Sequence, residues 1–189
     1  MKNKTLLGFI IASSLINAAF LVFLFLFLAF DGKQPYLALF ITFLMFAYHI
    51  DARLLSGALV SAFKGKIDIE RKSHRISEKE YRRLTKLKVR KWKGCFPTLF
   101  KKQFSLDKEG AVDEVLRSCI NAEIVHWLCL VLGLGAIPLG CLLSPDELWL
   151  YILTSLLALL FFDLPFILIQ RYNRFRLYKV KDRMDVRKE

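Results

Sequence analysis

The chain has 189 residues, of which 55% are hydrophobic, and it carries a formal net charge of +12. Seventeen phenylalanines and long Leu/Phe runs exceed what a soluble core of this length would bury, which excludes an ordinary soluble domain. We therefore expect one membrane-embedded domain over residues 1–189, with its positive charge facing an anionic membrane surface or a phosphate-bearing substrate rather than nucleic acid.

Four segments are apolar enough to span a bilayer, which needs about 20 helical residues. They are expected at about residues 5–30, 36–55, 120–143 and 147–169. The first is uncharged over Thr5–Phe30, which is longer than the apolar region of a signal peptide. Pro138 and Pro165 fall inside the last two segments, where membrane helices tolerate proline. The sequence predicts an all-α membrane protein, a four-helix transmembrane bundle.

The second span is followed by the only sizeable polar region. Leucines at helical spacing over residues 52–64 indicate either an interfacial helix or a continuation of the second span. Further on, Ser77-x-x-Glu80 resembles a capping box, which predicts a basic helix running from there toward Trp92. Basic and aromatic side chains alternate over residues 73–102, as suits a helical segment in the headgroup layer.

The basic residues predict the orientation of the spans. Residues 64–117 carry 17 Lys/Arg against 8 Asp/Glu, and the tail over residues 171–189 carries 8 against 3. The two short connections, residues 31–35 and 144–147, contain a single basic residue, Lys33. By the positive-inside rule, residues 64–117, the tail and both termini are expected on the cytoplasmic side.

Few ionisable residues fall within the spans, where such groups are costly and usually have a role or a partner. With this topology all of them collect in the inner half of the membrane, which predicts one shared polar layer: His49, Asp51, Arg53, Glu123, His126 and Asp163. His49 and Asp163 are more typical of polar groups that pack helices together, and His74, in the basic loop, is expected to be solvated.

Glu123 and His126 are three residues apart, so they project from one helix face. Such a pair can act as a general base, His126, and the carboxylate that orients its ring, although it can equally be a pair that ties two helices together. We take His126, Glu123 and Asp163 as the candidate catalytic residues. No metal-ligand set is expected, since the four cysteines form no CxxC motif and pair with no histidine.

Arginines gather where the fourth span ends. Residues 170–176 read Gln-Arg-Tyr-Asn-Arg-Phe-Arg, and arginine binds phosphate or carboxylate with a planar fork that lysine lacks. A simple positive-inside anchor would explain the charge equally well. The alternative is an anion cradle at the membrane surface, whose candidate donor-binding residues are Arg90, Lys91, Trp92, Lys93, Trp127, Gln170, Arg171, Tyr172, Asn173, Arg174 and Arg176.

Three motifs in this order resemble the glycosyl-4,4′-diaponeurosporenoate acyltransferase family. They are Val89-Arg90-Lys91-Trp92-Lys93, Ala122-Glu123-x-x-His126-Trp127, and Pro165 followed by Gln170-Arg171-Tyr172-Asn173-Arg174-x-Arg176-Leu177. The resemblance covers roughly residues 81–180, and Phe175 stands where the family pattern has proline. It implies a small enzyme of the bacterial cell membrane that esterifies the sugar of a glycosylated carotenoid.

The expected reaction is transfer of a fatty acyl group from a thioester donor, acyl-CoA or an acyl carrier protein, to a hydroxyl of a lipid-linked sugar or similar amphiphile. No bound cofactor is expected, and the expected partners are membrane lipids, the donor and the glycolipid acceptor. Two alternatives stay open: a non-catalytic assembly or scaffold protein that binds anionic lipid or a partner, and another lipid enzyme, such as a methyltransferase or lipid-phosphate enzyme.

Overall fold

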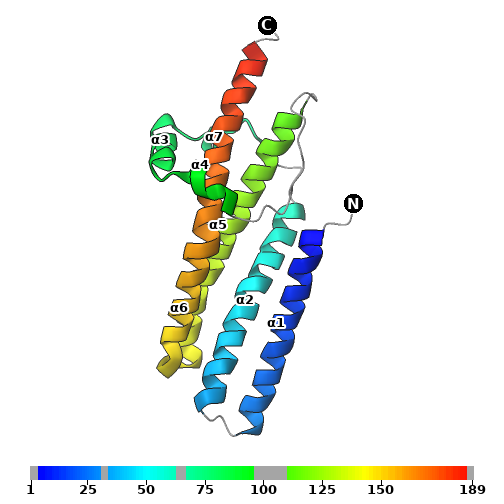
Figure 1. Ribbon diagram of the computed structural model, residues 1–189, viewed down its shortest axis with the longest axis vertical. Coiled ribbons are helices and arrows are strands. Elements are labelled where there is room, and N and C mark those ends of the chain that lie inside the picture. The colour runs from blue at the N-terminus through cyan, green and yellow to red at the C-terminus, as the bar shows by residue number, and fades with distance from the viewer. Residues whose placement is uncertain (1–3, 31–33, 63–66, 96–109, 187–189) are drawn as a thin grey trace. The chain divides into compact units, whose positions relative to one another are not determined.

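The structure is a computed structural model that describes residues 4–30, 34–62, 67–95 and 110–186 (Figure 1). All regular elements in these ranges are helices: α1 Lys4–Ala29, α2 Gln34–Ala62, η2 Lys72–His74, α3 Glu78–Lys86, α4 Val89–Trp92, η3 Lys93–Cys95, α5 Ala111–Leu143, η4 Pro145–Glu147, α6 Leu148–Ala158, η5 Leu159–Asp163 and α7 Leu164–Val186. Four helices are long and apolar enough to cross a membrane: Leu7–Ala29, Tyr36–Ala62, Ala111–Leu143 and Pro145–Val186. The predicted fold class is confirmed.

The helices extend beyond the predicted spans. Helix α2 continues to Ala62, so residues 52–62 prolong the second span. Helix α5 begins at Ala111, nine residues before the predicted start, and α7 continues through the basic tail to Val186. The predictions placed the start of the third span and the end of the fourth close to where charge begins. Lys, Arg and Glu are good helix formers, however, so charge ends an apolar run without ending the helix.

The basic helix predicted to run toward Trp92 is interrupted. Helix α3 ends at Lys86, and Lys88 takes a left-handed conformation with φ of 55° before the short helix α4 begins. At its start, Ser77 caps α3 by accepting a hydrogen bond from the backbone N–H of Glu80, as the capping motif predicts. The remaining residues of the basic region, 96–109, lie outside the described residues.

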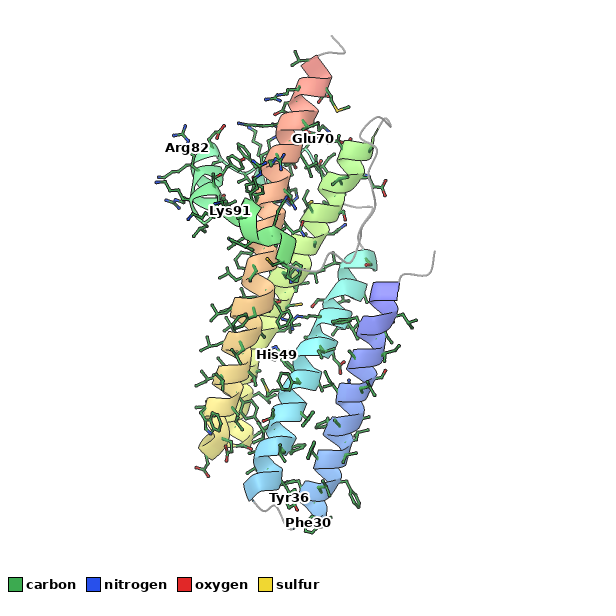
Figure 2. The ribbon with its side chains drawn as sticks, viewed as in Figure 1. Phe30, Tyr36, His49, Glu70, Arg82 and Lys91 are labelled. Carbon is green, nitrogen blue, oxygen red and sulfur yellow. The ribbon has the colours of Figure 1, made fainter. Side chains whose placement is uncertain are left out.

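The chain forms two compact units, residues 1–56 with 128–163, and residues 57–127 with 164–189. In the first unit, α1 and α2 are neighbours joined by stacked aromatic rings, among them Phe23 on Phe43 at 4.7 Å and Phe30 on Tyr36 at 4.9 Å (Figure 2). Helices α2 and α5 each pass from one unit to the other, and the single domain over residues 1–189 stays a prediction.

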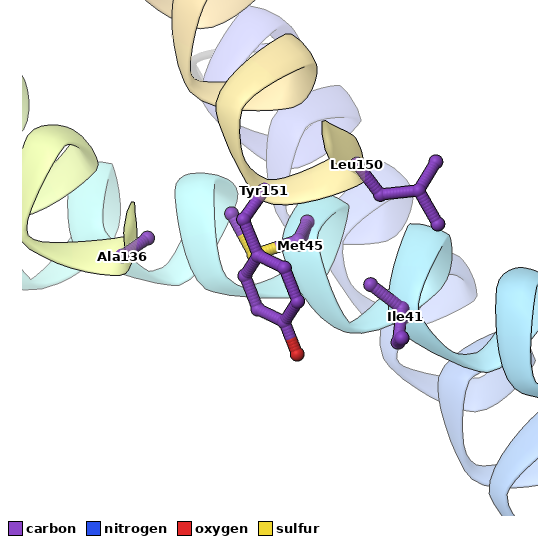
Figure 3. Packing of buried hydrophobic residues seen from close by; sticks show 5 residues of the cluster. All are labelled: Ile41, Met45, Ala136, Leu150 and Tyr151. Carbon is purple, nitrogen blue, oxygen red and sulfur yellow. The ribbon is translucent and has the colours of Figure 1, made fainter. Parts of the chain in front are cut away.

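The core of the first unit joins α2, α5 and α6 (Figure 3). Ile41, Met45, Ala136, Leu150 and Tyr151 are buried there together. The ring of Tyr151 lies directly against Gly140 of α5, where an added Cβ would be 2.5 Å from the ring. A glycine is needed at that position because any side chain would displace the tyrosine.

In the second unit, α3, α4 and the short helix η2 pack against α5 and α7. One apolar cluster joins α3 and α4 to α7 through Leu84, Val89, Ile169 and Tyr172. Another joins the segment before η2 to α5 and α7, through Ile69, Val112, Leu116, Ile120 and Tyr178. These clusters hold the polar side chains of α7 against α3 and α5.

Helices α6 and α7 are separated by a π-helical turn, Leu159–Asp163. Pro165 follows this turn closely and has no N–H to donate to the preceding turn, which is a usual cause of such a bulge. The turn leaves Asp163 buried, with 1% of its surface exposed.

Candidate active site

Glu123 of α5 binds two arginines of α7. Its Oε2 lies 2.7 Å from Nη2 of Arg174, and its Oε1 accepts a hydrogen bond of 3.0 Å from Nη1 of Arg171. The arginines are three residues apart, so they reach the carboxylate from one face of α7. Trp127, one turn along α5, also donates its indole N–H to Glu123 Oε1, at 3.4 Å. Four of the predicted site residues are therefore brought together.

Arg171 has a second carboxylate partner, Glu80 of α3. The Glu80 side chain reaches α7 rather than back to the Ser77 backbone, so the capping motif forms only the hydrogen bond from the Glu80 N–H to Ser77. Sequence reasoning did not assign Glu80 to the site. The capping motif already explained why a glutamate stands at this position. Nothing in the spacing indicates a partner 91 residues away.

A second group of predicted donor-binding residues forms around Tyr172. Lys93 donates a hydrogen bond of 3.2 Å to Asn173 Oδ1, and its ammonium lies 5.5 Å from the centre of the Tyr172 ring. The guanidinium of Arg176 lies 6.0 Å from the same ring. Two cations thus lie near the Tyr172 ring, where η3 meets α7.

Phe175 stacks on Tyr81 of α3 with 4.0 Å between ring centres and 13° between planes. Tyr81 also stacks on Tyr172, at 5.4 Å. These aromatic contacts fasten α3 to α7.

The remaining predicted donor-binding residues lie at the edges of these groups. Arg90 and Lys91 of α4 are exposed, as Figure 2 shows for Lys91. Trp92 is half-buried and donates its indole N–H to the Leu87 carbonyl at 2.9 Å, which closes the turn between α3 and α4. Gln170 is half-buried on α7, and Trp127 is 44% exposed.

His126, the predicted base, is half-buried, and its ring stacks on Phe166 with 4.7 Å between centres and 8° between planes. The contacts of Glu123 lie with the arginines of α7, so its role in orienting His126 stays a prediction.

Asp163 belongs to the first compact unit, where Arg53 of α2 binds it with Nη2 at 3.0 Å from Oδ1 and 2.9 Å from Oδ2. Arg53 also donates a hydrogen bond of 2.6 Å to the His49 carbonyl, and the Phe162 ring lies against the Arg53 guanidinium. A layer shared by Asp163, His126 and Glu123 stays a prediction, as does a catalytic role for Asp163.

His74 differs from its prediction. It was expected to be solvated, but it is half-buried at the end of η2. Burial lowers the pKa of His74 below its usual range, and the positive charges of Arg174 and Arg71 lower it further, whereas Glu123 and Asp68 act in the opposite direction. Its position in a basic loop did not indicate this burial.

Comparison with known proteins gives one finding. The model of the family described as glycosyl-4,4′-diaponeurosporenoate acyltransferase matches residues 66–183. No curated protein and no solved structure matches the chain. The match begins earlier than the resemblance seen in the motifs, so it includes η2 and the whole of α3.

Proposed function

The chain belongs to the glycosyl-4,4′-diaponeurosporenoate acyltransferase family, and we propose that it transfers a fatty acyl group from a thioester to a hydroxyl of a lipid-linked sugar. The observation that carries the proposal is the family match over residues 66–183. The matched residues include both the group around Glu123 and the group around Tyr172. The family name places the reaction in carotenoid glycolipid synthesis. The acceptor proposed here is the broader class, a membrane amphiphile that presents a sugar hydroxyl.

The donor is acyl-CoA or an acyl carrier protein, and the basic residues of the site form two sets, of which one binds the donor and the other holds the helices together. Arg171 and Arg174 already face two carboxylates, those of Glu80 and Glu123. They therefore hold α3, α5 and α7 in register. Lys93 and Arg176 have no acidic partner among the described residues, which leaves them available to a phosphate group.

The chemistry needs a proton acceptor for the sugar hydroxyl and a group that stabilises the oxyanion formed at the thioester carbonyl. The chain has three histidines, two of which, His74 and His126, lie within the matched residues. Arginine side chains are groups of the kind that supply the second requirement, and Arg171 and Arg174 lie within the matched residues.

The proposed setting is the cytoplasmic leaflet of the bacterial cell membrane, with both termini in the cytoplasm. The distribution of basic residues supports this orientation, because 17 Lys/Arg fall in residues 64–117. A donor made in the cytoplasm would then reach Lys93 and Arg176 without crossing the membrane.

The direct experiment uses the full chain purified in detergent or nanodiscs, with a radiolabelled acyl-CoA and a glycosylated carotenoid or a simple alkyl glucoside. The expected products are one glycolipid ester for each free thiol released, measured by chromatography and by thiol titration. A protein that binds the glycolipid but forms neither product would favour the alternative of a non-catalytic lipid-binding protein. Acyl-carrier-protein thioester replaces acyl-CoA in a parallel reaction to identify the donor.

A further inference from the structure

We propose that the outer face of helix α3 docks the protein that carries the acyl donor, an acidic acyl carrier protein. This inference rests on the proposed function and chooses between its two donors. The outer face is defined by four exposed basic residues, Lys79, Arg82, Arg83 and Lys86, of which Figure 2 labels Arg82.

The charges of α3 are divided between its two sides. Both of its acidic residues bind α7: Glu78 pairs with Lys179 at 2.7 Å, and Glu80 pairs with Arg171. The four basic residues recur at helical spacing, so they share one side of the helix. None of them pairs with an acidic side chain of the residues that the structure describes. The outer face therefore presents positive charge that no acidic group in this part of the chain neutralises.

The apolar side of α3 is already covered. Tyr81 stacks on Phe175 and on Tyr172, and Leu84 is buried in a cluster with Tyr172 and Ile169. An amphipathic helix that binds a membrane lays its apolar side into the bilayer. Because α7 covers that side of α3, the outer face can bind a partner mainly through charge.

The height of α3 along α7 favours a soluble partner over lipid headgroups. The apolar run of the fourth span ends at Ile169, and α7 continues beyond it as one helix. Lys179, the partner of Glu78, lies about 15 Å further along the helix axis, at about 1.5 Å per residue. The headgroup layer is only about 5–8 Å thick on each side of the hydrocarbon core. The start of α3, with Lys79, therefore lies beyond the headgroups by about one Debye length at physiological salt.

The outer face adjoins the residues proposed to bind the donor phosphate. Tyr81 of α3 stacks on Tyr172, and Lys93 and Arg176 lie near the Tyr172 ring. An acyl carrier protein holds its thioester on a flexible arm that contains a phosphate, and its surface is rich in acidic residues. A carrier protein docked on α3 would bring this arm to Lys93 and Arg176 while its acidic surface meets the outer face. Acyl-CoA has phosphates but no protein surface, so the outer face would serve the carrier protein alone.

Kinetics of the full chain in nanodiscs of neutral lipid test the docking surface, with the same acyl chain supplied on a carrier protein or on CoA. Reversing two charges (Arg82→Glu with Arg83→Glu) should raise the KM for the acyl carrier protein at least about tenfold, because charge pairs across an interface contribute strongly to association. The kcat and the KM for acyl-CoA should stay within about twofold of the wild type, which also shows that the variant is folded. The matched control, Lys72→Glu with Arg117→Glu, reverses two exposed charges on η2 and α5 and should leave both KM values unchanged.

A carrier protein without its arm separates the protein surface from the phosphate. This apo protein should inhibit the wild type competitively against the acyl carrier protein, because it still presents the acidic surface. The inhibition should weaken as the ionic strength rises. It should be lost in Arg82→Glu with Arg83→Glu and retained in the control variant.

The results distinguish a carrier protein from a membrane and from a failure of the proposed function. An unchanged KM for the acyl carrier protein in Arg82→Glu with Arg83→Glu, or an equal rise for both donors, would overturn the docking surface and leave the acyltransferase standing. The same holds if the wild type uses acyl-CoA but not the carrier-protein thioester. An acyl-CoA rate that increases with anionic lipid in the wild type and not in the variant would assign the outer face to the membrane instead. Wild-type protein that forms no ester from either donor would overturn the proposed function, and this inference with it.

Discussion

Nη2 of Arg174 lies 2.7 Å from Oε2 of Glu123, and both side chains are more than nine-tenths buried. Two charges removed from water in this way stabilise a fold only as a pair, because either one alone would keep the full cost of its desolvation. The pair therefore fixes the spacing of α5 and α7. Its loss should lower the stability of the protein more directly than it lowers the catalytic rate.

Glu123→Ala should lower the free energy of unfolding by about 3–5 kcal/mol, since it leaves Arg174 buried with a charge and without its main partner. The double change Glu123→Met with Arg174→Met should lower it less, because no charge is then stranded. Unfolding in mixed detergent micelles, followed by circular dichroism, measures both. The matched control is Glu78→Ala, which breaks the exposed pair with Lys179 and should cost about 1 kcal/mol or less. If the double variant is less stable than the single one, the pair is not acting as a unit.

Lys93→Ala should raise the donor KM about tenfold or more with little change in kcat. A charge-assisted hydrogen bond to a phosphate contributes roughly 1.5–3 kcal/mol, and Lys93 is held at the site by Asn173 and the Tyr172 ring. The same effect is expected for Arg176→Ala. Initial rates over a range of donor concentrations give both constants, and Arg117→Ala, at an exposed position of α5, corrects for the general loss of positive charge. Unchanged donor KM in both variants would remove these residues from the donor site.

Variants of the ion pair between Arg53 and Asp163 distinguish a structural role of Asp163 from a catalytic one. If the pair is structural, Asp163→Asn should lower the yield of folded protein, and exchanging the charges (Arg53→Asp with Asp163→Arg) should recover part of both folding and turnover. If Asp163 is catalytic, the exchange should restore folding without turnover. Size-exclusion profiles and the ester-forming rate, measured on the same preparations, distinguish the two results.

Both termini and the helices α3 and α4 are expected on the cytoplasmic side. In a variant without the four native cysteines, single cysteines introduced at Lys72 and at Asp146 should react with an impermeant maleimide on opposite sides of the membrane. Labelling of intact cells and of inverted vesicles makes the measurement. Reaction of both positions from the same side would contradict the four-span topology.

Much of the fold follows from the sequence for simple reasons. Apolar runs long enough to span a bilayer predicted the four apolar helices, and Ser77 with Glu80 predicted the start of α3. Helix ends were predicted less well: α2 continues through Ser56 and Gly57 to Ala62, and α7 continues into polar sequence with no glycine or proline there to stop it. The left-handed residue Lys88 carries no such signal either, and it was missed.

The partners within the site could not be predicted from spacing. Periodicity places Glu123 and His126 on one face of α5, but it does not say which other helix that face meets. Glu123 meets Arg171 and Arg174, and Glu80 joins them from α3, contacts that depend on how distant segments pack. His74 was assigned to solvent for the same reason, since its position in a polar segment does not show how that segment packs.

The stack of Phe175 on Tyr81 has a mechanical consequence. A proline at this position would lack the amide hydrogen that a continuous helix needs, and it would kink the helix between Arg174 and Tyr178. With phenylalanine there, α7 is a single rod of 23 residues, about 35 Å long, with no proline after Pro165. The segment over residues 69–75 is fastened to this helix at Tyr178 and Asp182, so it keeps its position along α7 without a hinge beneath it.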